Sequence, residues 1–317
     1  MPTPQAPPRI VSLLPAATEM VASLGLADRL VGRSHECDEP AAIAALPALT
    51  TPCLDPSLPS SGIHEQVQQA RDPLFSLDVE RLAALKPDLV ITQATCAVCA
   101  ISEEDVAEAV RRSGIQTRVV ALSPTTLDDV FRDVLALGDA TGRLAKAREV
   151  VARLHARCDS VACRLRAMTT HSETAIRVAM IEWLDPPMAA GNWVPEMVRL
   201  AGGHDALGRA GEHSHWITWD DVASADPDVV VLIPCGFPLD RVIAEARSPA
   251  VWPHLEKMRA VREGRAWAID GHHLFNRPGP RLVDSLEVLA EILHPGAFQF
   301  PATKRFAATI PHHQART

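Results

Sequence analysis

Apolar runs of strand length alternate with helical patterns along most of the chain. The runs at residues 10–14, 89–92, 117–122 and 229–231 are each long enough for a buried strand, and helical stretches lie between them. Strands that alternate with helices are typical of parallel sheets, because a crossover helix returns the chain to the same end of the sheet. The pattern therefore predicts an α/β fold with parallel sheets.

A much longer helical pattern lies in the middle of the chain. After a first helix, expected from about residue 125 to 138, apolar or small residues recur from Leu144 to Met168 in alternating steps of three and four. These steps place them on one face of a helix of roughly 27 residues and about 40 Å. Such a helix is too long to cover one small sheet, so we expect a spine that joins two lobes.

The segments on either side of this helix resemble each other. Glu19-Met20-Val21 is echoed by Glu196-Met197-Val198, and the stretch 82–91 is echoed by 222–231. Two echoes in the same order indicate an internal duplication, although a helix, a Pro-Asp turn and a strand are also a common combination. The expected division is a tail at 1–8, a lobe at 9–123, linking helices at 124–170, a second lobe at 171–295 and a tail at 296–317.

Composition narrows the class of protein. The 317 residues are 47% hydrophobic and carry a formal net charge of −8, which argues against a nucleic-acid partner because phosphate binding needs a basic face. The sequence has no apolar run of the length that spans a membrane. The first residues lack the features of a signal peptide, and seven cysteines suit a reducing compartment. We therefore expect a cytoplasmic monomer, unless the true start lies upstream.

Loops at the carboxyl ends of parallel strands gather along one edge of a sheet, and ligands bind there. This rule selects candidate loops in both expected lobes, and if the two edges face each other they form a cleft rich in His, Cys and Trp. The selected loops are 12–18, 34–38, 93–99, 183–192, 213–216, 234–237 and 271–277.

A His/Cys constellation is the most distinctive chemistry of the first expected lobe. His35 and Cys37 follow one short strand, and Cys96 and Cys99 follow the next long one. Sequential strands are usually neighbours, so the two loops are expected to converge, and three thiolates with one imidazole are a tetrahedral zinc set. The thiolates could also meet the metal of a bound chelate, or serve redox chemistry. The plain alternative is buried cysteine without a ligand.

Five motifs in order give the chain a resemblance to a known family. They are the stretch 14–19 after the first strand, 32–40 with Asp38-Glu39-Pro40, 80–90, 219–222 with Pro227, and 275–281. Over roughly residues 9–293 the chain resembles the ABC-importer substrate-binding proteins for metal chelates, and within them the cobalamin-binding members. The resemblance implies two Rossmann-like lobes of the periplasmic-binding-protein type joined by one helix, no catalysis, and a chelate, most specifically cobalamin, as the bound ligand.

The resemblance also implies roles for individual residues. Glu36 and Gln93 stand where the family has aromatic residues, so the first lobe departs from the family pattern. The histidines of the second lobe, including His272, could offer an axial nitrogen to a cobalt or iron centre. An acid on each lobe would dock on an ABC permease, which assigns Glu80 and Asp220 to that role. The expected ligand-binding residues are Glu36, Gln93, Trp183, Trp216, His213, His215, His273 and Phe275.

Two other classes of function remain open. The first is a cytoplasmic zinc- or cobalt-binding or redox-sensing protein that uses His35, Cys37, Cys96 and Cys99. The second is an enzyme, for which the sequence offers no nucleophile elbow, phosphate loop, dinucleotide fingerprint or zinc-protease motif. Titration with cobalamin and elemental analysis for zinc would separate the binding hypotheses.

Overall fold

The computed structural model describes residues 7–94, 101–168 and 175–311, and it divides into two compact units. The first unit comprises Met1–Leu58, Glu65–Pro124 and Asp128–Arg153, and the second comprises Pro59–His64, Thr125–Leu127 and Leu154–Thr317. The short segment Pro59–His64 thus belongs to the second unit although its chain neighbours on both sides belong to the first. Among the described residues, no helix has the length and apolar character needed to cross a membrane.

The first unit is built on a four-stranded parallel sheet in the order β2-β1-β5-β6. The sheet strands are β1 (Ile10–Ser12), β2 (Leu30–Arg33), β5 (Leu89–Gln93) and β6 (Arg118–Leu122). A small antiparallel pair is formed by β3 (Thr50–Pro52) and β4 (Phe75–Leu77). The helical elements are α1 (Pro15–Ser23), η1 (Ala27–Arg29), η2 (Ala41–Ala45), α3 (Val79–Leu85), α4 (Glu103–Ser113) and α5 (Leu127–Ala140).

The second unit is built on a seven-stranded mixed sheet in the order β10-β8-β7-β11-β12-β13, with β9 also paired with β7. Its strands are β7 (Ile176–Leu184), β8 (Pro187–Ala189), β9 (Gly203–Asp205), β10 (His215–Trp216), β11 (Val229–Leu232), β12 (Ala266–Ile269) and β13 (Ala307–Thr309). Its helices are α7 (Val194–Leu200), α8 (Trp219–Ser224), α9 (Leu239–Ala246), α10 (Trp252–Leu255), α11 (Arg259–Arg262), α12 (Leu282–Leu293) and α13 (Pro301–Phe306).

The parallel cores of the two units share one topology. The order β2-β1-β5-β6 of the first unit corresponds to β9-β7-β11-β12 of the second, and the helices α1 and α3 correspond to α7 and α8. Both echoes found in the sequence fall on these matching elements, as an internal duplication predicts. The predicted α/β fold with parallel sheets is therefore confirmed, and antiparallel strands are added at the borders of the second sheet.

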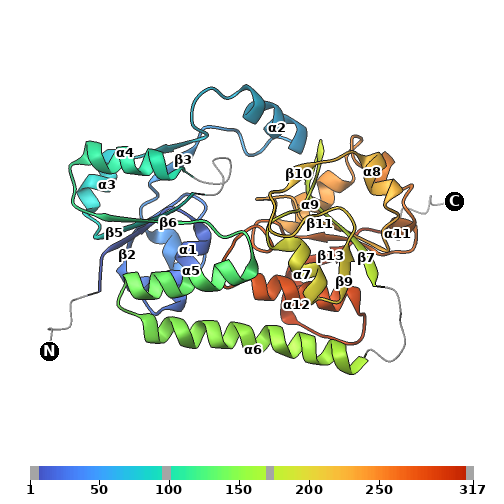
Figure 1. The fold of residues 1–317 in the computed structure, drawn as a ribbon. Helices are drawn as coiled ribbons and strands as arrows, with labels where there is room; N and C mark the ends of the chain where they lie inside the picture. Colours follow the sequence, from blue (N-terminus) through green and yellow to red (C-terminus); the bar gives the residue numbers. More distant parts are fainter. Residues whose placement is uncertain (1–6, 95–100, 169–174, 312–317) are drawn as a thin grey trace. The chain divides into compact units, whose positions relative to one another are not determined.

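The long helix expected in the middle of the chain is α6 (Leu144–Met168), drawn as the longest helix in Figure 1. Ala147, Val151 and Val161 of its apolar face are buried. The other face is not uniformly solvated, because the Arg157 guanidinium binds Asp284 and Glu287 of α12. The carboxylate of Glu287 accepts from Nε of Arg157 at 2.9 Å, so the two ion pairs of Arg157 fix the second half of α6 to α12.

Two expectations about the chain need correction. The expected tail at 296–317 includes α13 and β13, and β13 pairs antiparallel with β12, so residues up to 310 extend the sheet of the second unit. The strands β2 and β5, expected to be neighbours, lie on opposite sides of β1. A Rossmann-like sheet places its first strand in the middle, so β2 and β5 are about 10 Å apart.

A buried carboxylate at the end of β9 makes the stability of the second unit depend on pH. Burial raises the pKa of Asp205 to about 6. The hydrogen bonds that its Oδ1 accepts from the backbone amides of Leu207 and Gly208 lower this pKa, but by less than burial raises it. The folded pKa lies above the ordinary value, so the folded state binds more protons than the unfolded state between pH 4 and 6. The contribution of Asp205 to the free energy of unfolding is therefore present at low pH. This contribution falls by about 3 kcal/mol as pH rises through 6.

We expect Asp205→Asn to remove this fall, because an amide does not ionise and its oxygen can still accept the two amide hydrogen bonds. Urea unfolding of both proteins at pH 4.5 and pH 7.5 measures the effect. Equal losses of stability between the two pH values in variant and parent would contradict the assignment.

Candidate functional site

The strands of the second unit bring a row of large side chains to one face of the sheet. In the antiparallel register Trp183 of β7 lies opposite Met188 of β8, and Met188 lies opposite Trp216 of β10. Residues directly opposite each other in a ladder project from the same face. Three neighbouring strands span about 10 Å, which is on the scale of a flat tetrapyrrole ring. We name Trp183, Met188 and Trp216 the Trp-Met-Trp row.

The two ends of this row differ in exposure. Trp216 is 50% exposed and, with Met168, is one of the two large hydrophobic side chains that are exposed in the described chain. Trp183 is half-buried, and its ring meets that of Phe237 edge-on at 5.3 Å between centroids. Phe237 in turn lies under the guanidinium of Arg241, 3.6 Å from the ring centroid. Tryptophan is enriched at binding surfaces, because its large ring is apolar and its N–H can still find a hydrogen-bond partner.

The first turn of α2 (Ser60–Gln69) contacts both tryptophans. The carbonyl oxygen of Ser60 accepts from Nε1 of Trp183 at 3.2 Å, and the ring of His64 meets Trp216 edge-on at 4.8 Å. The carboxylate of Glu245 on α9 holds this turn by accepting from the backbone amide of Ser60 at 2.8 Å and from its hydroxyl at 2.5 Å. A ligand on the row therefore meets His64 as well.

A second group of side chains follows β12 at the carboxyl edge of the same sheet. The carboxylate of Asp270 accepts from the backbone amides of His272 and His273, at 3.0 and 2.8 Å, and from Nδ1 of His273 at 3.1 Å. Burial by itself raises the pKa of Asp270, but these hydrogen bonds and the nearby histidines leave that pKa below its ordinary value. Asp270 therefore faces His273 as a carboxylate.

The loop that carries this group is held from several sides. Gly271 packs so closely on β11 that a Cβ there would lie 2.1 Å from the carbonyl oxygen of Pro234. The amide of Asn276 donates to the carbonyl oxygens of Ile233 and Gly271, each at 2.9 Å. Nε2 of His272 lies 2.7 Å from a guanidinium nitrogen of Arg277, which is 6% exposed. This loop is therefore positioned by the fold before any ligand arrives.

The other expected ligand residues of the second unit lie elsewhere. His213 is exposed, and His215 precedes Trp216 on β10, so it projects from the opposite face to the row. Phe275 is fully buried in the left-handed conformation, and its carbonyl oxygen accepts from Nε1 of Trp193 at 2.7 Å. Burial favours a packing role for Phe275, while its expected contact with a ligand stays a prediction.

In the first unit, His35 and Cys37 lie in the loop after β2, where the sequence places them. Nδ1 of His35 is 2.8 Å from the Thr50 hydroxyl, and burial, opposed by the carboxylate of Glu36, lowers the pKa of His35. The Cys37 sulfur is buried among hydroxyls, 3.0 Å from Oγ1 of Thr18 and 3.2 Å from Oγ of Ser34. These contacts describe a packed thiol and favour the plain alternative for Cys37.

The rest of the expected metal site is not tested by the described residues. Cys96 and Cys99 lie outside the described residues, and β1 separates the two strands that lead to the loops. Gln93 is buried at the end of β5, and the half-buried Glu36 lies beside His35, with 3.4 Å between a carboxylate oxygen and Nε2. A cavity of about 10 Å³ between His35, Glu36 and Phe75 is large enough for about one water molecule. The four-residue metal set stays a prediction.

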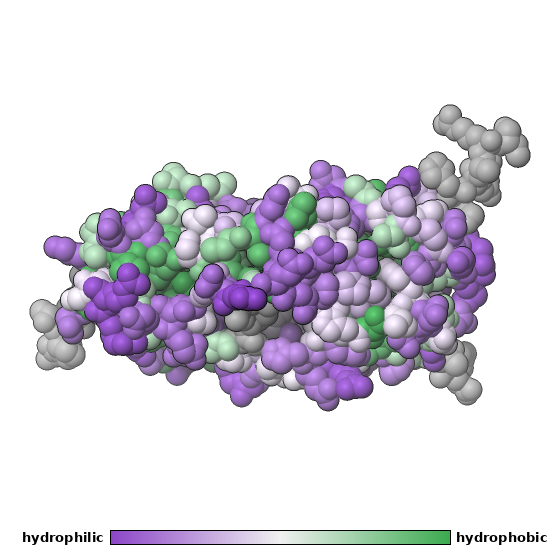
Figure 2. Space-filling view, turned by 90° about the horizontal axis from the view of Figure 1, so that it is seen from above, coloured by the Kyte–Doolittle hydropathy of each residue, from purple (hydrophilic) through white to green (hydrophobic). Residues whose placement is uncertain are grey.

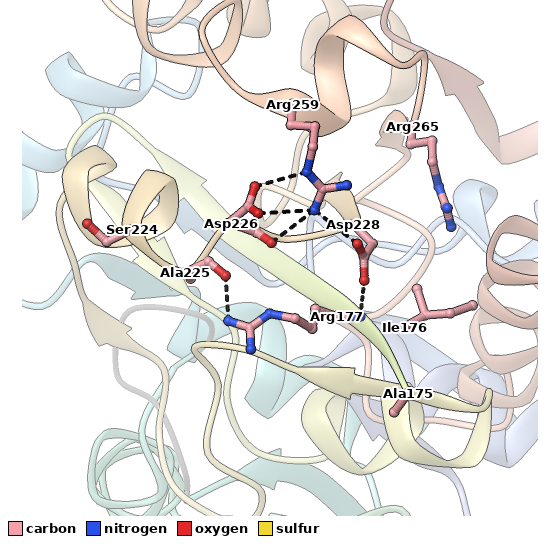
Figure 3. A pocket seen from close by; sticks show the side chains of 9 residues that line it. All are labelled: Ala175, Ile176, Arg177, Ser224, Ala225, Asp226, Asp228, Arg259 and Arg265. Atoms are coloured by element: carbon pink, nitrogen blue, oxygen red, sulfur yellow. Dashed lines mark hydrogen bonds and ion pairs between the residues drawn. The ribbon is translucent and has the colours of Figure 1, made fainter. Parts of the chain in front are cut away.

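A larger hollow of about 640 Å³ lies at the amino ends of β7 and β11 (Figure 3). Arg259 binds Asp226 and Asp228 there, and Arg177 donates to the carbonyl oxygen of Ala225. These interactions join the turn before β11 to its neighbours. The hollow is at the opposite end of the strands from the Trp-Met-Trp row, whereas ligands of parallel sheets bind at the carboxyl ends. We therefore take the carboxyl edge as the candidate site.

The two expected docking acids occupy equivalent places in the two units. Glu80 lies in the first turn of α3 and Asp220 in the first turn of α8, and both are exposed. Another residue caps each helix. The side chain of Asp78 caps α3 by accepting a hydrogen bond from the backbone amide of Arg81, and the side chain of Thr218 caps α8 by accepting one from the backbone amide of Asp221. Because these caps satisfy the helix starts, Glu80 and Asp220 are not needed for capping and remain at the surface.

Figure 2 shows the mainly hydrophilic character of one face of the molecule.

A family model described as periplasmic binding protein matches residues 10–271 of the chain. The chain belongs to this family. An uncharacterized ABC transporter substrate-binding lipoprotein of Bacillus subtilis is 23% identical over 92% of this chain and 82% of its own. A cobalamin-binding protein of Halobacterium salinarum is 25% identical over 91% of this chain and 70% of its own. A periplasmic heme-binding protein of Pseudomonas aeruginosa has a similar structure, with a TM-score of 0.72, 22% identity, and coverage of 96% and 98%.

Membership in the family confirms the resemblance found in the sequence and its implied fold. It also corrects one expectation, because the cytoplasmic location is wrong for a member of this family. The relatives are a lipoprotein and a periplasmic protein, which points to a place outside the cytoplasm. The absence of signal-peptide features in the first residues and the odd number of cysteines were not sufficient grounds for a location.

The hydroxyl contacts of Cys37 lead to a prediction about thiol reactivity. In the native protein, iodoacetamide should label Cys37 at least about ten times more slowly than the exposed Cys53 and Cys163, because a buried thiol is shielded from the reagent. Mass spectrometry of tryptic peptides at timed intervals measures the three rates. Labelling of Cys37 as fast as that of Cys53, with protection by added zinc, would instead support a metal site at His35 and Cys37.

Proposed function

We propose that the chain is the substrate-binding component of an ABC importer for a tetrapyrrole metal chelate, and that the chelate is a corrinoid such as cobalamin. Three relatives support the class: a substrate-binding lipoprotein, a cobalamin-binding protein and a periplasmic heme-binding protein. The cobalamin-binding relative and the sequence motifs favour a corrinoid over heme. In this role the protein works outside the cytoplasm and delivers its ligand to a permease.

The Trp-Met-Trp row is the observation that carries the proposal. Its residues lie on neighbouring strands, so their side chains form one apolar strip about as wide as a flat macrocycle. The half-exposed Trp216 gains most from a ligand, because its ring is still in contact with water.

The chemistry of such a ligand suits the neighbouring groups. A corrinoid or a heme presents a flat conjugated face, which can stack on tryptophan, and a metal centre, which takes a nitrogen ligand. The row supplies the rings, and the loop after β12 supplies the histidines. Both belong to the second unit, so this part of the site is present in one body.

We expect Trp216→Ala to weaken cobalamin binding about tenfold, because removing one stacked aromatic ring costs about 1–2 kcal/mol. Met168→Ala is the matched control, because Met168 is also a large exposed hydrophobic residue but lies at the end of α6. Calorimetric titration with cyanocobalamin and with hemin measures both variants and the parent. If neither compound binds the parent at high micromolar concentration, the proposal is rejected. If Met168→Ala weakens binding as much as Trp216→Ala, the row is not the site.

The equivalent exposed acids, Glu80 and Asp220, are proposed to dock the protein on arginines of the permease, as in the family that the chain resembles. The double variant Glu80→Ala, Asp220→Ala should bind the chelate as tightly as the parent. Uptake into vesicles that contain the permease should fall about tenfold or more, because charge pairs across an interface speed association and removing the acids leaves their arginine partners unpaired. Glu103→Ala, an exposed acid in the first turn of α4, is the control and should leave uptake unchanged. Unchanged uptake with the double variant would place the docking surface elsewhere.

A further inference from the structure

The first turn of α2 is capped by a residue of another helix. This turn contains Gly62 and no acid, so it is a weak helix start by itself. The backbone amide and the hydroxyl of Ser60 both donate to Oε1 of Glu245, at 2.8 and 2.5 Å. A charged acceptor at the first amide of a helix satisfies a donor that the helix itself leaves unpaired. Helix α9 therefore supplies the cap of α2 from 185 positions along the chain.

The place of Glu245 in its own helix does not favour an acid. Glu245 lies in the last turn of α9, where the partial negative charge of the helix end makes a carboxylate unfavourable. Its hydrogen bonds go to Ser60, which is fully buried. Hydrogen bonds to a charged group are stronger than neutral ones, and removing the acceptor would leave two buried donors unpaired. The acid at this position therefore stabilises the turn of α2.

One face of this turn contacts the second unit, to which residues 59–64 belong. Ser60, Ile63 and His64 have the spacing i, i+3 and i+4, so they project from the same side of the helix. The carbonyl oxygen of Ser60 accepts from Nε1 of Trp183, and Ile63 packs on the hydrophobic core of the unit. The ring of His64 meets that of Trp216. This single face therefore contacts both ends of the Trp-Met-Trp row.

The contact with Ser60 also determines what Trp183 can offer a ligand. Tryptophan has one N–H donor and no acceptor, and the N–H of Trp183 is bound to the carbonyl oxygen of Ser60. The indole therefore presents its apolar ring to a ligand and keeps its polar edge on the turn. This arrangement suits the flat conjugated face of a macrocycle better than a polar substituent.

From these contacts we infer that the first turn of α2 is a wall of the chelate site, and that Glu245 is its positioning residue. The inference rests on the proposed function and adds a further part to the same site. Glu245 acts through Ser60 on Trp183 and, along the helical face, through His64 on Trp216. A wall that is ordered before the ligand arrives strengthens binding, because the ligand does not have to supply the free energy of ordering it.

Hydrogen exchange and ligand binding test the two halves of this inference in the full chain. In Glu245→Ala the amide of Ser60 loses its acceptor, so its exchange rate should rise about 10- to 100-fold. Affinity for cyanocobalamin and for hemin should fall about tenfold, because the wall must then be ordered on binding. Stopped-flow tryptophan fluorescence should show that most of this loss is faster dissociation.

Two variants of α9 separate positioning from a general loss of structure. Glu245→Gln keeps an oxygen acceptor at the same place, so exchange at Ser60 and affinity should stay close to those of the parent, because a neutral acceptor weakens these hydrogen bonds without removing them. Asp240→Ala removes an exposed acid from the same helix and should leave both quantities unchanged.

Two variants of the turn itself extend the test. Ser60→Ala removes only the hydroxyl donor and should give a smaller change in the same direction, which carries the test if Glu245→Ala does not fold. His64→Ala should weaken binding while exchange at Ser60 stays slow, and His64→Phe, which keeps a ring beside Trp216, should restore most of the affinity. His204→Ala, an exposed histidine on β9, is the control and should bind as the parent does.

The outcomes of the two proposals can be told apart. If Glu245→Ala speeds exchange at Ser60 but binds the chelates as tightly as the parent, the turn is not part of the site; the inference is overturned and the proposed function stands. Unchanged exchange at Ser60 in Glu245→Ala overturns the positioning role in the same way. Tighter binding by Glu245→Ala would show that the turn blocks the row instead of lining it. If the parent binds neither cyanocobalamin nor hemin, the proposed function fails and the inference fails with it.

Discussion

Parallel pairing of the first strand of each unit with two later strands decides where every candidate side chain lies. Because β7 pairs with β11, which pairs with β12, the loops that follow these strands all leave the same edge of the sheet. Trp183, Phe237 and Asp270 come from segments far apart in the sequence and reach one edge for this reason. The same constraint in the first unit places β1 between β2 and β5, so these two strands are not direct neighbours.

Hydrogen-bonding groups then select among residues of one type. The sequence offers several histidines and cysteines near the expected edges, and their residue types alone do not rank them. Nδ1 of His273 lies 3.1 Å from the carboxylate of Asp270, whereas Nε2 of His272 lies 2.7 Å from a guanidinium nitrogen of Arg277. The hydroxyls of Thr18 and Ser34 surround the Cys37 sulfur and make it a packed group. The hydrogen-bond partners of buried polar groups thus distinguish residues of one type that the sequence alone leaves equivalent.

The fold could be predicted from the sequence to a large extent, because its signals are periodic. The alternation of strands and helices and the apolar face of α6 gave the α/β units and the joining helix, and the two echoes correspond to equivalent elements. The carboxyl-edge rule selected the loops of Trp183, Trp216 and His273. Asp270 could have been found from its place directly after a strand and before two histidines. The contacts of Ser60 with Glu245 and Trp183 could not, because they join residues more than 100 positions apart, and periodicity does not report contacts of that kind.

The assignment of Pro59–His64 to the second unit has a consequence for the modularity of the chain. The two units cannot be separated by dividing the chain at one position, because the second unit includes the turn Pro59–His64 from the first half of the sequence. A protein shortened to the residues after the long helix would lack Ser60 and would leave the carboxylate of Glu245 and the indole N–H of Trp183 without these partners. The two units have similar sheets, and this one turn makes the second unit depend on sequence that precedes it.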